Sequence, residues 1–220
     1  MARVYGLVGW IGCGKDTAAQ YLVDRYGYRQ VSFANTLKDA VAAVFGWSRE
    51  LLEGRTMESR VWREQPDSWW SQRLNIPNLT PRWVLQNVGT EVFRNHFHQD
   101  IWIASTERVI QSYLDQGYNV VISDCRFANE VNAIKNVGGM TCRVFRGENP
   151  VWYEAAVDYN KGPNGNSGWA LGKAKLDRYK VHASEYSSIG LEYDFVIQND
   201  FTINDLHNQV NQFLNLRVSS

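Results

Sequence analysis

The stretch VYGLVGWIGCGKDT, residues 4–17, decides the fold of this chain. It begins with the apolar run Val4–Val8, which is typical of a buried strand. A loop of the pattern G-x-x-x-x-G-K follows, with its glycines and lysine at Gly9, Gly12, Gly14 and Lys15. Such glycines let a loop wrap a phosphate with its backbone N–H groups, and the next helix adds the positive end of its dipole. The stretch therefore predicts a phosphate-binding loop whose lysine reaches the terminal phosphates of a nucleoside triphosphate.

The residue after the lysine departs from the usual pattern. Phosphate loops normally carry Ser or Thr at this position, where the hydroxyl touches Mg²⁺, but here Asp16 precedes Thr17. A carboxylate can bind Mg²⁺ directly or through water, because this ion prefers hard oxygen ligands. The alternative is that Asp16 only favours the helix N-terminus through its charge. We favour the metal role.

Apolar runs and helical periodicity alternate along the rest of the chain. Further strands are predicted at 31–34, 120–123, 140–145 and 195–197. Helices are predicted at 16–26, 36–45, from 81 onward, 101–116, 127–137 and from 203 onward. Asn35 and Thr80 are expected to cap two helices, and Thr202 to form a capping box with Asp205. Strands that alternate with helices imply a three-layer α/β fold, with a parallel sheet of about five strands covered by helices on both faces.

Length and composition exclude several classes of protein. The chain has 220 residues, which suits one domain with inserted segments. Lys and Arg number 23 and so do Asp and Glu, so the net charge is zero and a global basic field for nucleic acid is excluded. Three cysteines without a C-x-x-C pair exclude a disulfide framework and a four-cysteine zinc site. The apolar N-terminal run is too short for a membrane span and lacks a signal-peptide pattern, so we expect a soluble, cytoplasmic protein.

Three charged residues follow the predicted strand 120–123. Asp124 ends that strand, and ligands of open α/β sheets bind beyond the carboxyl ends of the strands. We expect Asp124 to orient Mg²⁺ or water beside the phosphate loop, with capping of the next helix as an equal alternative. Arg126 and Glu130 form an i, i+4 pair in the less favourable order for a surface salt bridge. We predict instead that Arg126 holds the transferring phosphates, with Glu130 orienting it or a substrate.

The predicted helix after Thr80 carries a polar stripe. Its members are spaced by four residues, at Arg82, Gln86, Thr90 and Arg94. The opposite, apolar face consists of Val84, Leu85, Val88 and Val92. An ordinary solvated face is one interpretation of the stripe. The other is a row of donors for a phosphate and a base edge, because Arg binds phosphate with two N–H groups and Gln both donates to and accepts from a base.

Several features favour a small-molecule kinase among phosphate-loop proteins. The chain is short, it has no N-K-x-D motif for guanine, and the irregular stretch before Asp124 offers room for a second substrate. Segment 147–172 holds five glycines and two prolines and is predicted to be a mobile, loop-rich excursion. A basic stretch follows it, with Lys173, Lys175, Arg178, Lys180, His182 and, at its end, Glu185. We predict a basic lid over the triphosphate, with a solvated charged loop as the alternative; a single nearby histidine makes a zinc site improbable.

Several segments in collinear order resemble the bacteriophage deoxynucleoside monophosphate kinases. They are G-K-D-T at 14–17, F-A-N-T-L-K-D-A at 33–40, R-x-x-L-Q-x-x-G-T-E at 82–91, Trp102, D-C-R-x-x-x-E at 124–130 and H-x-S-E at 182–185. The resemblance implies that the γ-phosphate of ATP is transferred to a deoxynucleoside 5′-monophosphate with Mg²⁺, and it makes G-K-D a feature of the family. It also implies acceptor or catalytic roles for Lys38, Arg60, Arg82, Gln86, Thr90, Trp102, Arg126 and Glu130.

The same resemblance sets the expected organisation. One P-loop kinase domain, 1–220, is expected to have its core at 1–34, 96–146 and 190–217, an acceptor-binding region at 35–95 and a lid at 147–188. A homodimer is suggested, in the host cytoplasm if a phage encodes the chain, with neither polymeric nucleic acid nor a membrane as partner. Animal-type phosphomevalonate kinases also resemble the G-K-D loop and are the alternative among enzymes. A nucleotide-binding module without kinase activity is the alternative outside them.

Overall fold

The structure is a computed structural model that describes residues 3–164 and 166–216. The chain divides into two compact units. One, the sheet unit, comprises the chain up to Ser32 and from Ile110 onward, and the other, the helical unit, comprises Phe33–Val109. None of the helices in the described ranges is long and apolar enough to cross a membrane.

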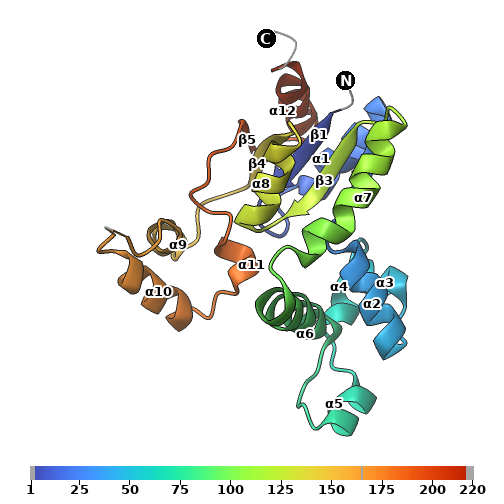
Figure 1. Cartoon of the computed structure of the whole chain (residues 1–220), viewed down its shortest axis with the longest axis vertical. Coiled ribbons are helices and arrows are strands. Elements are labelled where there is room, and N and C mark those ends of the chain that lie inside the picture. Colours follow the sequence, from blue (N-terminus) through green and yellow to red (C-terminus); the bar gives the residue numbers. More distant parts are fainter. Residues whose placement is uncertain (1–2, 165, 217–220) are drawn as a thin grey trace. The chain divides into compact units, whose positions relative to one another are not determined.

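The sheet unit is built, within its described residues, on five strands that Figure 1 draws as arrows. They are β1 Val4–Val8, β2 Arg29–Val31, β3 Val120–Cys125, β4 Met140–Phe145 and β5 Phe195–Gln198. Every pairing between neighbours is parallel, and the order is β2-β3-β1-β4-β5. Parallel neighbours need crossover connections, and helices supply most of them. The predicted α/β fold with a parallel sheet is therefore confirmed.

The helices of the sheet unit follow the strands along the chain. They are α1 Lys15–Tyr26, α8 Ala128–Asn136, α9 Tyr153–Asn160, α10 Trp169–Arg178, α11 Ala183–Tyr186 and α12 Ile203–Asn215. One more helix, α7 Ile101–Asp115, begins in the helical unit and ends in the sheet unit. Gly27 ends α1 in the left-handed conformation, directly after the predicted last residue 26, and Thr202 caps α12 in the predicted capping box with Asp205.

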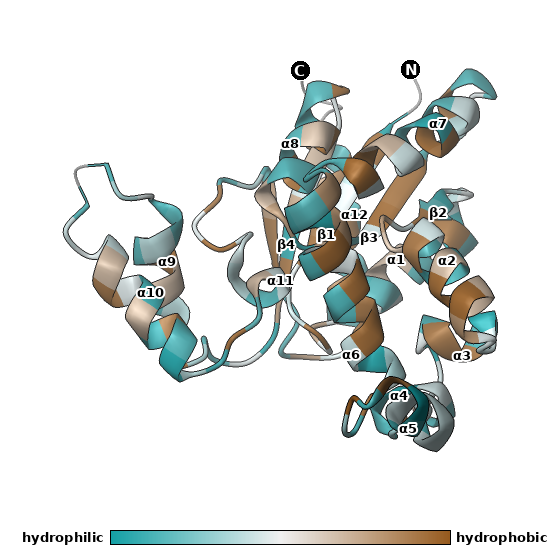
Figure 2. Ribbon diagram, turned by 60° about the horizontal axis from the view of Figure 1, so that its bottom comes forward, coloured by the Kyte–Doolittle hydropathy of each residue, from teal (hydrophilic) through white to brown (hydrophobic). Residues whose placement is uncertain are grey.

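Side chains that alternate along β1 explain why both faces of the sheet are covered. Tyr5 and Leu7 point to the face under α1 and α12, where they join a buried cluster that includes Leu22. Gly6, between them, points to the face under α8, and a Cβ at this position would lie 2.3 Å from Cδ1 of Ile134. The central strand β1 and its neighbour β3 accordingly appear largely hydrophobic in Figure 2, as expected for strands that are buried on both sides.

The carboxyl end of β3 is irregular. Between Gly6 and Val8 the register of β1 against β3 shifts, because Ser123 and Asp124 together lie opposite one residue of β1. This is the geometry of a β-bulge, which bends a strand and changes the direction of its side chains. The strand continues to Cys125, so Asp124 belongs to the strand instead of following it.

The helical unit contains short helices and one helix of a different type. The helices are α2 Asn35–Phe45, α3 Arg49–Glu53, α4 Met57–Glu64, α5 Ser68–Leu74, α6 Pro81–Gln86 and the π-helix η1 Asn87–Phe97. Thr80 caps α6 as predicted: its hydroxyl accepts a hydrogen bond from the backbone N–H of Trp83 at 3.1 Å.

The side chains buried after Gln86 differ from those that the predicted faces imply. A π-helix bonds each residue to one five positions away, so its turns are wider than those of an α-helix, and residues four or five apart lie on about the same face. Thr90 and Arg94 of the predicted polar stripe are buried, whereas Val92 of the predicted apolar face is 48% exposed. The interpretation of the stripe as an ordinary solvated face is therefore wrong at Thr90 and Arg94, and Val92 does not belong to a buried apolar face.

Three other local predictions are also wrong. The second strand covers Arg29–Val31 instead of 31–34. Asn35 is the first residue of α2 and makes no capping bond, because Ala34 occupies the N-cap position. The segment 147–172, predicted to be loop-rich, contains α9 and the start of α10. These helices pack closely, since a Cβ on Gly172 would lie 2.6 Å from a backbone oxygen of α9.

Burial of Phe213 under the sheet gives a test of this packing. Its ring lies 4.7 Å from that of Tyr5 between centroids, and the side chain is fully buried. Phe213→Ala should lower the free energy of unfolding by about 3–5 kcal/mol, measured by urea denaturation. Phe201→Ala is the matched control, because Phe201 is 73% exposed, and should change it by less than about 0.5 kcal/mol. Similar losses for the two variants would contradict the described core.

Candidate active site

The phosphate-binding loop connects β1 to α1, as predicted. All three of its glycines have positive φ angles: 153° at Gly9, 78° at Gly12 and 107° at Gly14. Two of them also allow close approach. A Cβ on Gly9 would lie 2.1 Å from the backbone oxygen of Val144, and one on Gly14 would lie 2.3 Å from Nδ2 of Asn199. Any other residue at Gly9 would force the loop away from β4, whereas one at Gly14 would displace the side-chain amide of Asn199.

The lysine of the loop folds back against the loop itself. Nζ of Lys15 donates a hydrogen bond to the backbone oxygen of Trp10 at 2.6 Å and lies 3.6 Å from Sγ of Cys13. The lysine is 8% exposed. A buried ammonium needs oxygen partners, which a bound phosphate also offers. The loop therefore holds a cation where a phosphate group would enter.

Two carboxylates lie near this loop in the sheet unit. Asp16 is exposed in the first turn of α1, together with Thr17. Asp124 lies on the bulge of β3, the strand that pairs with β1, and its neighbour Cys125 pairs with Val8 at the start of the loop. The hydroxyl of Ser32, after β2, donates to Oδ2 of Asp124 at 2.5 Å. Its hydrogen bond orients the carboxylate at the carboxyl edge of the sheet.

Arg126 and Glu130 interact, but through the backbone. The carboxylate of Glu130 is 2% exposed and accepts hydrogen bonds from the backbone N–H groups of Arg126 at 2.7 Å and Phe127 at 3.1 Å. This caps α8. The guanidinium of Arg126 forms an ion pair with Glu185 of α11 at 3.0 Å. The predicted pair thus fixes the corner between β3 and α8.

The thiol between these acids is not a nucleophile. Burial raises the pKa of Cys125 well above its usual value, and the nearby carboxylates of Glu130 and Asp124 raise it further. A thiol must lose its proton to act as a nucleophile or a metal ligand. Cys125 is therefore a small packing residue.

The predicted acceptor-binding cations of the helical unit have partners. Lys38 forms an ion pair with Glu53 at 2.9 Å, and Arg82 forms one with Glu64 at 3.1 Å. Nε of Arg60 donates to the backbone oxygen of Gly54 at 3.0 Å. Burial of Glu53 opposes its ionisation, but Lys38 and Arg49 outweigh this and lower the pKa of its carboxyl. These contacts orient long side chains that would otherwise be mobile.

The remaining predicted residues lie around the start of the π-helix. Gln86, the last residue of α6, is half-buried, and Thr90 is buried in η1. Trp102 is 5% exposed, and its indole N–H donates to the backbone oxygen of Gly89 at 2.9 Å. A solvated-surface interpretation does not fit Thr90. Trp102 holds the π-helix instead of presenting its ring to solvent.

The carboxylates near the phosphate loop fit Mg²⁺ better than a metal ion whose ligands all come from the protein. Among the residues that the structure describes, no group of three or more His, Cys, Asp or Glu side chains could hold a metal ion. Mg²⁺ commonly takes one or two carboxylates and completes its shell with water and substrate phosphates. Asp16 and Asp124, both hard oxygen donors of the sheet unit, suit that pattern.

Two contacts of the site were not predicted from the sequence. The amide of Asn199 donates to the backbone oxygen of Cys13 at 3.0 Å, which fastens the phosphate loop to the segment after β5. The second contact is the hydrogen bond from the hydroxyl of Ser32 to Asp124, which orients the carboxylate. Asn199 lies just after the strand predicted at 195–197, where ligand-contacting residues of α/β folds gather. Ser32 was predicted to lie within the strand 31–34, so no signal in the sequence marked it.

The chain resembles named kinases. A protein of Acanthamoeba polyphaga mimivirus named "Putative deoxynucleotide monophosphate kinase" is 32% identical over 215 residues, covering 93% of this chain and 92% of that protein. The "Deoxynucleoside-5'-monophosphate kinase" of Escherichia phage T5 is 28% identical over 178 residues, covering 59% of this chain and 70% of its own. Among solved structures, dephospho-CoA kinase from Campylobacter jejuni aligns over 98% of this chain and 96% of its own, with 15% identity and a TM-score of 0.46. No protein-family model matches.

A glycine-rich loop and its lysine, placed after a central strand of a parallel sheet, define a P-loop nucleotide-binding protein. The identity to the mimivirus protein over nearly the whole length goes further. This chain belongs to the deoxynucleoside monophosphate kinase family. The family and the enzyme class predicted from the sequence are therefore confirmed, and with them the use of a nucleotide.

The cap formed by Glu130 can be tested by its effect on stability. Glu130→Ala leaves two partly buried backbone N–H groups without their acceptor, so the free energy of unfolding should fall by about 1–3 kcal/mol. Urea denaturation measures this separately from activity. Glu107→Ala, at an exposed position of α7, is the control and should stay within about 0.5 kcal/mol of the native protein. If Glu130→Ala also stays in that range, the carboxylate does not stabilise the corner.

Proposed function

We propose that this protein transfers the γ-phosphate of ATP to the phosphate of a deoxynucleoside 5′-monophosphate and so forms a diphosphate. The observation that carries the proposal is the membership of the chain in the deoxynucleoside monophosphate kinase family, over almost its full length. The complete phosphate loop supports the ATP side of the reaction. Phosphoryl transfer requires mainly the positioning of two phosphates and the neutralisation of their charge.

Residues of the sheet unit bind and activate ATP in this proposal. The backbone N–H groups of the loop, with Gly9, Gly12 and Gly14, surround the β- and γ-phosphates. Lys15 exchanges its contact with the Trp10 carbonyl for phosphate oxygens, because these are stronger acceptors for an ammonium. Arg126 neutralises the transferring group, and the basic residues of α10 add to the positive potential.

Asp16 and Asp124 would hold Mg²⁺. Asp16 is exposed at the loop, and the hydrogen bond from Ser32 fixes the direction of Asp124. A Mg²⁺ ion held there would supply positive charge that offsets the charge of the phosphates. Thr17 beside Asp16 supplies a further hydroxyl near the same phosphates.

The helical unit binds the acceptor. Lys38, Arg60 and Arg82 are held by partners that each use only part of their donor groups, so the remaining donors can meet the acceptor phosphate. Gln86 reads the base and Thr90 supports it, while Trp102 contributes by holding the π-helix. The acceptor phosphate is itself the nucleophile and is already anionic near neutral pH, so no strong general base is required.

The assay that tests this function measures ADP formation from ATP with a panel of acceptors. Deoxynucleoside monophosphates should support turnover. Lys15→Ala should lower kcat by about 10²–10³, because a preorganised charge is lost, while its thermal unfolding shows that the fold is retained. Turnover only with phosphomevalonate, or steady ATP hydrolysis without an acceptor, would overturn the proposal.

The role of Gln86 in base recognition gives a separate prediction. Gln86→Ala should raise KM for the acceptor and change the ranking of kcat/KM among the deoxynucleoside monophosphates, because polar groups of the base lose a partner. KM for ATP should hardly change. Gln72→Ala, at an exposed position of α5, is the matched control and should leave all of these constants unchanged. The same ranking and the same acceptor KM in Gln86→Ala as in the native protein would remove Gln86 from the acceptor site.

The predicted division into core, acceptor region and lid, and the homodimer, stay predictions. Size-exclusion chromatography with light scattering would measure the oligomeric state directly.

A further inference from the structure

Glu185 contacts the site from a distant part of the sequence. It lies on α11, a single helical turn between α10 and β5. Nδ1 of His182 accepts a hydrogen bond from the backbone N–H of Ser184 at 3.2 Å, so the turn is capped by its own segment. The carboxylate of Glu185 is therefore not needed to cap this turn and is directed to another partner.

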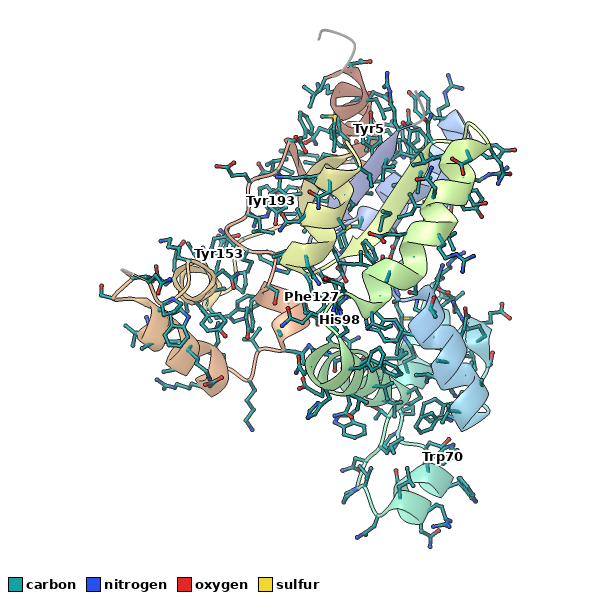
Figure 3. The ribbon with its side chains drawn as sticks, in the orientation of Figure 1. Tyr5, Trp70, His98, Phe127, Tyr153 and Tyr193 are labelled. Carbon is teal, nitrogen blue, oxygen red and sulfur yellow. The ribbon has the colours of Figure 1, made fainter. Side chains whose placement is uncertain are left out.

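That partner is the guanidinium of Arg126, 59 residues earlier in the chain. The ion pair joins NH1 of Arg126 to Oε1 of Glu185 at 3.0 Å. The two side chains are 34% and 21% exposed, so the pair is only partly shielded from water. Figure 3 labels the neighbouring Phe127, which lies where the start of α8 meets α11. Partly exposed ion pairs of this kind contribute little to stability. The effect of the contact that matters is therefore the orientation that it gives to the guanidinium of Arg126.

The backbone of Arg126 is already fixed without this contact. Buried Glu130 accepts hydrogen bonds from the backbone N–H groups of Arg126 and Phe127 and holds the corner after β3. The long side chain of Arg126 is the part that still has freedom. A guanidinium has five N–H donors, and the pair with Glu185 uses one nitrogen, which leaves donors on its other edges for phosphate oxygens.

We propose that Glu185 is a positioning residue for phosphoryl transfer: it holds the Arg126 guanidinium in a fixed direction at the carboxyl edge of the sheet. This inference rests on the proposed function, because it assigns Arg126 to the transferring phosphate. Glu185 does not touch the phosphates itself. A negative charge beside Arg126 weakens the attraction of the guanidinium for ATP in the ground state, so the benefit of Glu185 lies in orientation and belongs to kcat rather than to KM.

The first test compares Glu185→Ala with the native enzyme in ADP formation. The expected result is a fall in kcat of about 10- to 100-fold, since a small misplacement of a catalytic group has effects of this size. KM for ATP should not rise, and the affinity for ATP measured by calorimetry should not fall. Glu154→Ala, which removes an exposed carboxylate from α9, is the matched control and should leave kcat unchanged. Glu185→Gln keeps an acceptor oxygen with the same reach, so its kcat should lie between those of Glu185→Ala and the native enzyme.

The second test asks whether Glu185 acts through Arg126. In an Arg126→Ala background, Glu185→Ala should cause no further loss of kcat, because the group that it positions is absent. An additive loss would overturn the proposal, and so would an unchanged or raised kcat in Glu185→Ala alone. Thermal unfolding of each variant separates these outcomes from misfolding, and Glu185→Gln remains testable if Glu185→Ala does not fold. If the native enzyme has no activity, the proposed function is overturned. If the native enzyme is active and Glu185→Ala has the same kcat, only this inference is overturned.

Discussion

The phosphate loop can approach β4 only because Gly9 has no side chain: a Cβ there would lie 2.1 Å from the backbone oxygen of Val144. This close approach brings the start of α1 to the carboxyl edge of the sheet. The same edge receives Asp124 from β3 and Asn199 from the end of β5. Because all strands are parallel, their carboxyl ends lie on one side, and the polar groups of the site gather there.

Polar groups at this edge are held by specific partners, which sets their directions before any ligand binds. Glu130 accepts from two backbone N–H groups, and Asp124 accepts from the hydroxyl of Ser32. Lys15 is satisfied by a carbonyl of its own loop. The bulge in β3 adds to this arrangement, since it sets the direction of Asp124. Such preorganisation favours phosphoryl transfer, because the donors need not rearrange when charge moves between phosphates.

The helical unit achieves order in another way. Its long cations are fastened by Glu53 and Glu64, and its π-helix is held by the indole of Trp102. π-Helices are rare, and those that occur are frequently found at functional sites. In this family member Thr90 and Arg94 of the π-helix are buried, whereas Val92 is about half exposed.

The sequence by itself determined the features that depend on neighbours along the chain. The strand, loop and helix from Val4 to Tyr26 were predictable because an apolar run, glycines at fixed positions and a helical period are patterns of neighbouring residues, and the motifs identified the family. The same holds for the caps at Thr80 and Thr202. Only the tertiary structure decided contacts such as Ser32 with Asp124 and Cys13 with Asn199, which are 92 and 186 residues apart. It also decided the π-helix and the helices within 147–172. No local pattern specifies these features, because they exist only where packing brings distant segments together and satisfies their polar groups.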